Sequence, residues 1–237
     1  MPFRFFIPPS EAALAAGPVP MPAATARHVK VLRLTMGEVV RVFDGAGGEW
    51  EGEVLDGRTF LLHRHHAIER EADVRVMLAV GMPANERMDA LVEKAVELGV
   101  ARIQPLLSRR SVLRLHGERA ERRVAHWQGV AIAACEQCGR NRVPVIAPVA
   151  TLQEWLRQME GDCAGGHRCL LSPTATAPLQ PFVQGDVVWM VSGPEGGLDE
   201  EEITMLMRAR FRPVSLGPRV LRADTAPLAA LVRAGVG

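Results

Sequence analysis

From Asp73 onward, short apolar runs alternate with segments that carry apolar residues at helical spacing, and this alternation restricts the possible folds more than any other feature. The runs have the length and composition of buried strands: "VRVMLAVG", "ARIQPLLS", "RVPVIA", "RCLLS", "VVWMVS" and "RPVSLG". Helices are predicted between them over residues 85–98, 119–138 and 152–159, and a last helix from about Asp224. This order predicts an α/β fold with a parallel sheet covered on both faces and ligands bound at the carboxyl ends of its strands.

The first seventy residues show a different pattern, of short strand-like segments separated by turns. The segments "GEVVRVFDG", "GEWEGEVLDG" and "TFLLHRHHAI" are rich in valine and aromatic residues and are punctuated by glycine, which predicts a small β-barrel. The change falls in the charged stretch "IEREAD". We therefore expect two domains, residues 1–70 and residues 71–237.

Composition narrows the class of protein. The chain has 237 residues, of which 48% are hydrophobic, but its longest apolar runs are well short of the roughly 20 residues that cross a bilayer. The start, "MPFRFFIPPS", lacks the basic and long apolar regions of a signal peptide. We expect a cytoplasmic protein without membrane association. Four unevenly spaced cysteines, Cys135, Cys138, Cys163 and Cys169, indicate reduced thiols.

The charge is unevenly distributed, although the formal net charge is only +1. Eight arginines lie close together in the sequence: Arg109, Arg110, Arg114, Arg119, Arg122, Arg123, Arg140 and Arg142. The stretch "GLDEEEI" is acidic by contrast. A local basic surface suits an anionic partner such as RNA. An arginine-rich helix face that is simply solvated is the equal alternative.

The stretch "VSGPEGGLDEEEI" joins a predicted strand to a predicted helix through a glycine-rich loop. In a parallel sheet this loop lies at the ligand-binding edge, and its glycines let the backbone approach a ligand closely. It is no phosphate-binding P-loop, because the lysine and hydroxyl that follow the glycines there are missing. The acidic helix start also repels phosphate, so we expect a neutral or cationic ligand. A turn without chemistry is the alternative.

A second glycine-bearing loop lies in "VSLGPRVLRADTAPLAAL". A strand ends at Leu216 and Gly217, the loop carries Arg219 and Arg222, and Asp224 or Thr225 is predicted to cap the last helix. Two such loops near one sheet edge could hold a single ligand largely through backbone groups. An ordinary loop with two solvated arginines is the alternative.

Other patterns indicate no metal or nucleophile. Cys135 and Cys138 form a CxxC, but no second CxxC or histidine pair lies at ligand spacing and the segment reads as helix. His63, His65 and His66 are expected on the surface of a strand. "DGAGGEWEG" reads as a hairpin turn. We expect no metal.

Together, "SGPEGGLDEEEI" and "VSLGPRVLRADTAPLAAL" resemble the paired loops of the SPOUT methyltransferases, specifically the 16S ribosomal RNA uridine N3-methyltransferase family. The resemblance extends to "RHVKVLRLTMGEVVRVFDGAGGEWEGEV", "ERMDALVEKAVELGVARIQPLLSRRSV" and "ACEQCGRNRVPVI", and so covers nearly the whole chain. One departure is Asp224, where the family commonly has glutamate.

The resemblance implies a PUA-like β-barrel followed by a SPOUT-type α/β domain with a C-terminal trefoil knot, a rare exception to the rule against knots. It further implies a homodimer that completes the site, and S-adenosylmethionine as cofactor. The residues expected to hold the cofactor are Leu171, Ser172, Pro173, Ser192, Gly193, Gly196, Gly197, Leu216, Gly217 and Leu221.

The implied reaction is methylation of N3 of a uridine in the decoding region of 16S ribosomal RNA, within the 30S subunit. Arg222 is expected to stabilise charge on the uracil oxygens, and Glu195 to orient the base or assist proton removal. The residues expected to contact RNA phosphates are Arg27, His28, Arg33, Arg109, Arg110 and Arg140. The alternatives are a SPOUT ribose 2′-O-methyltransferase acting on transfer or ribosomal RNA, and a non-catalytic RNA-binding protein of ribosome assembly.

Overall fold

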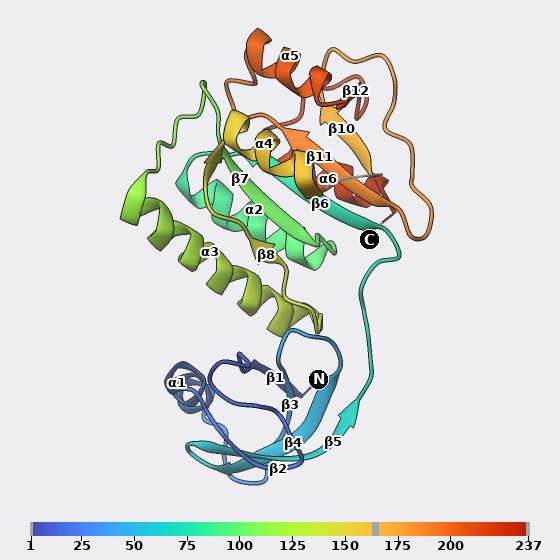
Figure 1. Ribbon diagram of the computed structural model, residues 1–237. Helices are drawn as coiled ribbons and strands as arrows, with labels where there is room; N and C mark the ends of the chain where they lie inside the picture. The colour runs from blue at the N-terminus through green and yellow to red at the C-terminus, as the bar shows by residue number, and fades with distance from the viewer. Residues whose placement is uncertain (1, 163–165, 236–237) are drawn as a thin grey trace. The chain divides into compact units, whose positions relative to one another are not determined.

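The computed structural model describes residues 2–162 and 166–235, and the chain divides into two compact units (Figure 1). The smaller unit comprises the chain up to Glu71 together with Ile132–Val143, and the larger comprises Ala72–Ala131 together with the chain from Pro144 onward. The sequence placed Ile132–Val143 in the second domain, whereas these residues pack with the first.

The smaller unit is built on one five-stranded sheet, in the order β1-β3-β4-β5-β2. Its elements are β1 Phe3–Phe6, β2 Gly17–Pro20, α1 Ala23–Val31, β3 Val39–Phe43, β4 Glu49–Asp56 and β5 Thr59–His66. Strands β1 and β3 are parallel and the other pairs are antiparallel. Alternate residues of these strands, such as Phe5, Val40, Val42 and Phe60, form its apolar core, as a period of two requires. The three strands predicted here are confirmed.

A buried ionic network holds the end of helix α3 (Gly117–Cys138) and the following loop to this sheet. The Arg4 guanidinium donates to Glu49 at 2.5 Å and to the side-chain oxygen of Asn141 at 2.6 Å. Arg70 donates to Glu49 at 3.0 Å and to the Gly139 carbonyl at 2.8 Å. Buried charges of this kind are retained only when they are paired and hydrogen-bonded.

The larger unit contains a parallel sheet in the order β12-β10-β11-β6-β7-β8, with β9 beside β7. Its strands are β6 Arg75–Gly81, β7 Arg102–Leu107, β8 Val145–Ile146, β9 Ala150–Thr151, β10 His167–Leu171, β11 Val187–Ser192 and β12 Arg212–Val214. Its helices besides α3 are α2 Asn85–Glu97, α4 Leu152–Asp162, α5 Glu200–Arg208 and α6 Thr225–Arg233. The predicted α/β class and parallel sheet are confirmed.

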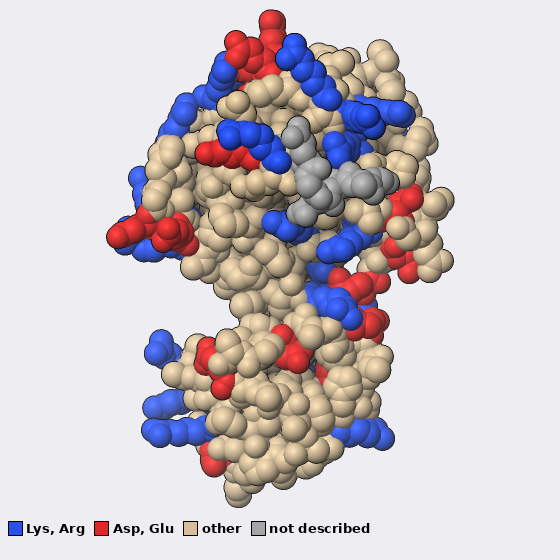
Figure 2. Space-filling view, viewed as in Figure 1, with Lys and Arg blue, Asp and Glu red and all other residues tan. Residues whose placement is uncertain are grey.

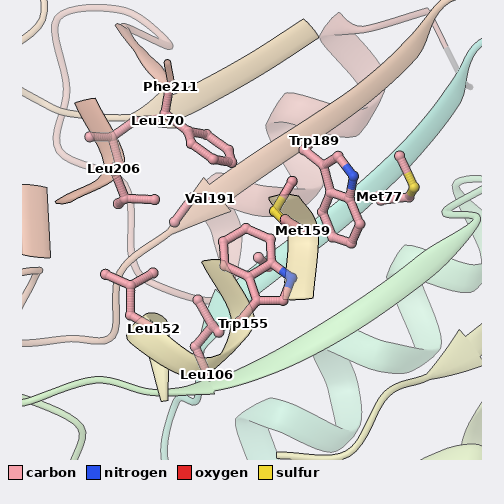
Figure 3. Close-up of a cluster of buried hydrophobic side chains, with 11 residues drawn as sticks. Met77, Leu106, Leu152, Trp155, Met159, Leu170, Trp189, Val191, Leu206 and Phe211 are labelled. Carbon is pink, nitrogen blue, oxygen red and sulfur yellow. The ribbon is translucent and has the colours of Figure 1, made fainter. Parts of the chain in front are cut away.

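Helices cover both faces of this sheet. On one face, Trp155 of α4 and Leu206 of α5 pack with Met77 of β6 and with Trp189 and Val191 of β11 (Figure 3). On the other face, α6 contacts β6, β11 and α2. Because strand side chains alternate between faces, a strand covered twice is apolar throughout, which is why "VVWMVS" and "VRVMLAVG" read as continuous runs.

Helix α2 forms where the apolar spacing predicted it. Met88, Leu91, Val92 and Ala95 are all buried on one face of the helix. The helix ends before Gly99, whose φ of +85° is the left-handed conformation that glycine adopts at a helix end without steric cost.

The start of the last helix differs from its prediction. Asp224 occupies the N-cap position of α6, but its backbone is helical, with φ −83° and ψ −28°, and its side chain makes no capping hydrogen bond. Capping requires a non-helical backbone that turns the side chain toward the free N–H groups. The prediction that Asp224 caps the last helix is therefore wrong.

Three of the four cysteines, Cys135, Cys138 and Cys169, are free thiols, and Cys163 lies outside the described residues. Burial raises the pKa of the Cys135 thiol to about 12 and that of Cys169 to about 11. Thiols held protonated in this way are poor nucleophiles and poor metal ligands. Within the described ranges, no group of three or more His, Cys, Asp or Glu side chains is placed to hold a metal ion. No helix there is long and apolar enough to cross a membrane.

Candidate functional site

A cleft of about 770 Å³ opens at the carboxyl ends of β10, β11 and β12. These strands are neighbours in the parallel sheet, so the loops that follow them meet at one edge. The cleft is lined by residues 170–175, 192–195, 197–198 and 216–217, by residues 219–223, and by Arg87, Ile203, Pro213 and Ala226. Its volume is within the usual range for small-molecule sites. None of these described lining residues is a lysine.

The cleft brings together most of the residues that the sequence singled out. Nine of the ten expected cofactor-binding residues line it: Leu171, Ser172, Pro173, Ser192, Gly193, Gly197, Leu216, Gly217 and Leu221. Glu195 and Arg222 line it as well. The tenth residue, Gly196, lies instead against Arg110. The two loops "SGPEGG" and "SLGPRVLR" thus form parts of one hollow, as their predicted position at one sheet edge requires.

The glycine loop between β11 and α5 has a shape that side chains would disturb. A Cβ on Gly193 would lie 3.0 Å from the backbone nitrogen of Leu198, which leaves no room for one without a shift. Gly197 has a φ of +69°, and its N–H donates to the Pro194 carbonyl at 2.8 Å to close the turn. The loop therefore lines the cleft closely with main-chain atoms.

The acidic start of α5 forms a capping box. Asp199 accepts a hydrogen bond from the Glu202 N–H at 2.8 Å, and the Glu202 carboxylate accepts one from the Asp199 N–H at 3.0 Å. The hydrogen bond from the Glu202 backbone, with help from Arg109, holds the pKa of Asp199 below its ordinary value. The carboxylates thus use the helix end themselves, which leaves no phosphate site there.

Arg109 and Arg110, both expected to contact RNA, lie against this loop and helix. The Arg109 guanidinium pairs with Asp199 at 3.2 Å and Glu201 at 2.5 Å, and the backbone N–H of Arg109 donates to the Glu202 carboxylate at 3.0 Å. The Arg110 guanidinium donates to the Gly196 carbonyl at 3.2 Å. Arg109 thus connects the segment after β7 to the start of α5, and Arg110 connects it to the glycine loop.

Glu195 is attached to the start of α2 through one of its two carboxylate oxygens. Its Oε1 accepts from the Ala84 N–H at 3.2 Å and from the Arg87 guanidinium at 3.4 Å. Its side chain is 28% exposed, and Oε2 has no hydrogen-bond partner among the described residues. Glu195 thus fixes the loop and still presents one acceptor oxygen.

Arg219 and Arg222 lie on the loop after β12 and are both exposed. In the described part of the chain, neither guanidinium has a hydrogen bond or ion pair, so both are available to a ligand. Val220 lies between them, lines the cleft and is 81% exposed.

The remaining expected RNA contacts differ in accessibility. Arg27 and His28 of α1, and Arg33 after it, are exposed. Figure 2 shows basic side chains projecting from the smaller unit on the side where Figure 1 draws α1. Arg140 is only 4% exposed and pairs with Glu71 through two hydrogen bonds, one of them at 3.0 Å. As it lies here, Arg140 is not available to a phosphate.

The sequence did not single out Arg87, which lines the cleft from α2. It follows β6, which lies next to β11 in the sheet. Arg87 lies one turn into the helix that follows a strand, and this position could have suggested the ligand-binding edge of the sheet. The sequence does not give the order of the strands, however, so it does not show that β6 lies beside β11.

Comparisons with known proteins agree with this architecture. Residues 70–234 match the model of the RNA methyltransferase domain, and residues 22–62 match that of the RNA methyltransferase PUA domain. The class defined by the fold and the cleft is therefore an RNA methyltransferase with an N-terminal PUA domain. The expected PUA-like domain followed by an α/β methyltransferase domain is confirmed.

Individual relatives narrow the class. Ribosomal RNA small subunit methyltransferase E of Synechocystis sp. is 33% identical over 210 residues, which cover 86% of this chain and 68% of the relative. The crystal structure of the Neisseria gonorrhoeae enzyme of the same name, bound to S-adenosyl methionine, is 32% identical. It has a TM-score of 0.87 and covers 98% of this chain and 96% of its own.

A third relative is the putative methyltransferase Lpg2936 of Legionella pneumophila, in complex with the cofactor. It is 30% identical, with a TM-score of 0.86, and covers 98% of this chain and 96% of its own. The chain belongs to the ribosomal RNA small subunit methyltransferase E family. The resemblance drawn from the two glycine loops is confirmed.

Proposed function

We propose that the protein transfers a methyl group from S-adenosylmethionine to N3 of a uridine in the decoding region of 16S ribosomal RNA. The observation that carries this proposal is the convergence of the loops after β10, β11 and β12 on one cleft without lysine. The Neisseria relative, which covers nearly the whole chain, is described as bound to S-adenosyl methionine.

The chemistry of the cleft fits this cofactor. Apolar side chains, among them Leu171, Leu198 and Leu221, offer surfaces for an adenine ring. Main-chain groups of the glycine loop can bond its polar atoms, because no side chain screens them. The bound cofactor supplies a methyl group on a positively charged sulfonium. Glu195 has one carboxylate oxygen without a partner among the described residues that can face that charge, and Arg219 and Arg222 of the same cleft are left for the RNA.

Arg222 is the proposed catalytic residue that faces the uracil. Loss of the N3 proton places negative charge on the uracil carbonyl oxygens, and a guanidinium already in position stabilises such charge. Arg222 lines the cleft, is exposed, and has no competing partner in the part of the chain that the structure describes.

Glu195 is the proposed acceptor for the uracil N3–H. Its Oε1 is used by Ala84 and Arg87, which fixes the carboxylate in the loop, while Oε2 is left for the base. A base bound by both Arg222 and Glu195 would be oriented for in-line attack. Because N3 lies on the pairing edge, the uridine must be unpaired or flipped out before it enters.

The RNA backbone is proposed to contact Arg27, His28 and Arg33 of the smaller unit, whose exposed side chains can reach phosphates. Arg109, Arg110 and Arg140 have protein partners in the structure. We propose that the first two support the glycine loop. A phosphate contact by Arg140 would require it to leave Glu71.

A homodimer, a trefoil knot in the C-terminal part and a cytoplasmic location belong to the same proposal, as do assembled 30S particles as the substrate. Val220 supports a partner at the site, because an apolar side chain that is 81% exposed on a cleft loop is well placed to be covered. Light scattering on the purified chain measures the oligomeric state directly.

The proposal is tested by titrating the purified chain with S-adenosylmethionine in a calorimeter and then measuring transfer of labelled methyl to 16S RNA and to 30S particles. We expect binding of the cofactor and transfer to at least one of the two substrates. Binding without transfer would favour a non-catalytic role in ribosome assembly, and absence of both would refute the proposal.

A further inference from the structure

A second, smaller hollow of about 320 Å³ lies in the larger unit, between the start of α2 and the segment that leads into α3. It is lined by Ala84, Val112, Leu113, Arg114 and Arg119, and we call it the arginine groove. Two of its five lining residues are arginines and none is acidic. The groove therefore attracts an anion.

The arginine groove lies beside the cofactor cleft. Ala84, which lines the groove, donates its N–H to Glu195, which lines the cleft, at 3.2 Å. Arg87, one turn further along α2, lines the cleft. The start of α2 thus separates the two hollows, and a ligand that fills the cleft next to Glu195 and extends beyond it can reach the groove.

In the segment after β7, buried and exposed side chains alternate. Leu113 and Leu115 are buried, with exposed fractions of 8% and 2%, while Val112, Arg114 and the residue after Leu115 are exposed. An extended chain anchored at every second residue presents the residues between them to solvent. The position of Arg114 at the groove therefore follows from the packing of its neighbours.

The two arginines of the groove have donors to spare. Arg114 uses one guanidinium nitrogen to donate to the Arg109 carbonyl at 2.7 Å, which fixes the direction of the side chain and leaves its other N–H groups. Arg119 is exposed, and in the described ranges its side chain has no hydrogen bond or ion pair. This distinguishes the pair from Arg109 and Arg110, whose guanidinium groups bond to the loop and helix beside the cleft.

We infer that the arginine groove binds a backbone phosphate of the RNA next to the uridine whose base enters the cofactor cleft. Arg114 and Arg119 contact the phosphate oxygens, and Val112, 71% exposed, packs against the adjoining sugar. The inference rests on the proposed function, because it takes the RNA substrate and the location of the target base from it. A phosphate contact so close to the reacting base fixes which nucleotide of the RNA lies at the cleft.

The test measures binding of 16S RNA transcribed in vitro to the full chain without cofactor, by filter binding over a series of salt concentrations. Arg119→Ala should weaken binding and lower the slope of log affinity against log salt by about 0.7 to 0.9, the value for one lost phosphate contact. Arg119→Lys should keep most of the slope, because it keeps the charge. The double variant Arg114→Ala/Arg119→Ala should lose about twice as much.

The matched control is Arg157→Ala, which removes the same charge from an exposed position on α4 that lines neither hollow. Equal slopes for Arg119→Ala and Arg157→Ala would overturn the inference. So would a loss of cofactor affinity in Arg119→Ala, because the groove would then act on the cleft itself. If the slopes differ as expected but the wild-type protein transfers no methyl to RNA, the proposed reaction fails and the phosphate site stands.

Discussion

The Arg110 guanidinium donates a hydrogen bond to the Gly196 carbonyl at 3.2 Å, and a Cβ on Gly196 would lie 3.0 Å from the Cβ of Arg110. The arginine thus supports the glycine loop at Gly196, which does not line the cleft although its neighbours Glu195 and Gly197 do. Through these contacts, Arg110 helps to hold the glycine loop in the conformation that lines the cofactor site.

Arg110→Ala is expected to weaken S-adenosylmethionine binding about fivefold, because one hydrogen bond that orders the loop is lost. Calorimetry without RNA measures this directly, with Arg157→Ala as the control of equal charge. The salt dependence of RNA binding should match that of the control. A salt slope lower than that of Arg157→Ala, with unchanged cofactor affinity, would instead show that Arg110 contacts a phosphate.

Arg222→Ala is expected to reduce methyl transfer about 10²- to 10³-fold, the usual cost of removing one preorganised group that stabilises developing charge. Cofactor affinity should change little, since the guanidinium faces the base. Single-turnover transfer with labelled cofactor provides the rate. The comparison variant is Arg219→Ala, which removes a second exposed arginine from the same loop and should have a much smaller effect. Near-normal transfer by Arg222→Ala would contradict the assigned role.

Glu195→Gln separates the two roles of this residue. A glutamine oxygen can still accept from the Ala84 N–H, so the loop and cofactor affinity should be retained, while the base loses its charged acceptor. We expect transfer to fall about 10²-fold or more, in the range of lost general-base catalysis. Glu195→Ala should in addition weaken cofactor binding. Full activity of the glutamine variant would show that the carboxylate serves only the shape of the loop.

The smaller unit should lose stability in acid because of Glu49. Burial alone would raise its pKa, but hydrogen bonds from Arg70 and Arg4 outweigh burial and lower the pKa from its ordinary value of 4.5 to about 2. A depressed pKa of an acid stabilises the fold above pH 4.5, and the contribution is lost as the pH falls toward 2. Its size is about 3 kcal/mol.

The matched variant is Glu49→Gln, whose unfolding is compared with that of the wild type by urea titration at a series of pH values. At neutral pH the variant should be less stable by about 3 to 5 kcal/mol, because Arg4 and Arg70 lose their charged partner. The difference should shrink steadily below pH 4.5. A difference that stays constant with pH would show that Glu49 keeps its ordinary pKa.

Local structure could be predicted from the sequence, because it depends on residues that are close together along the chain. The spacing of Met88, Leu91 and Ala95 identified α2, and the order strand, glycine loop, acidic helix start located the loop that ends in the capping box of Asp199 and Glu202. Both depend on residues three or four positions apart. The grouping of the two glycine loops likewise followed from the rule that parallel strands end at one edge.

Contacts between residues far apart in the sequence could not be predicted in the same way. Arg140 reads as a basic surface residue, yet it is buried against Glu71, which is 69 positions earlier in the chain. Arg87 joins the cleft because β6 lies beside β11, a neighbourhood that no local pattern encodes. The failed cap at Asp224 depends on a backbone angle that the composition of "RADTAP" does not determine.

The most direct test of the central claim locates the methyl group. Unmodified 16S RNA and 30S particles are incubated with the protein and S-adenosylmethionine. The RNA is then digested to oligonucleotides, which give the site of the methyl group, and to nucleosides, which give its chemical position, and both digests are analysed by mass spectrometry. The account predicts one additional N3-methyluridine at a single site in the decoding region, and far less of it after the same short incubation with Arg222→Ala. A methyl group on a ribose 2′ oxygen, or on any base other than uracil, would contradict it.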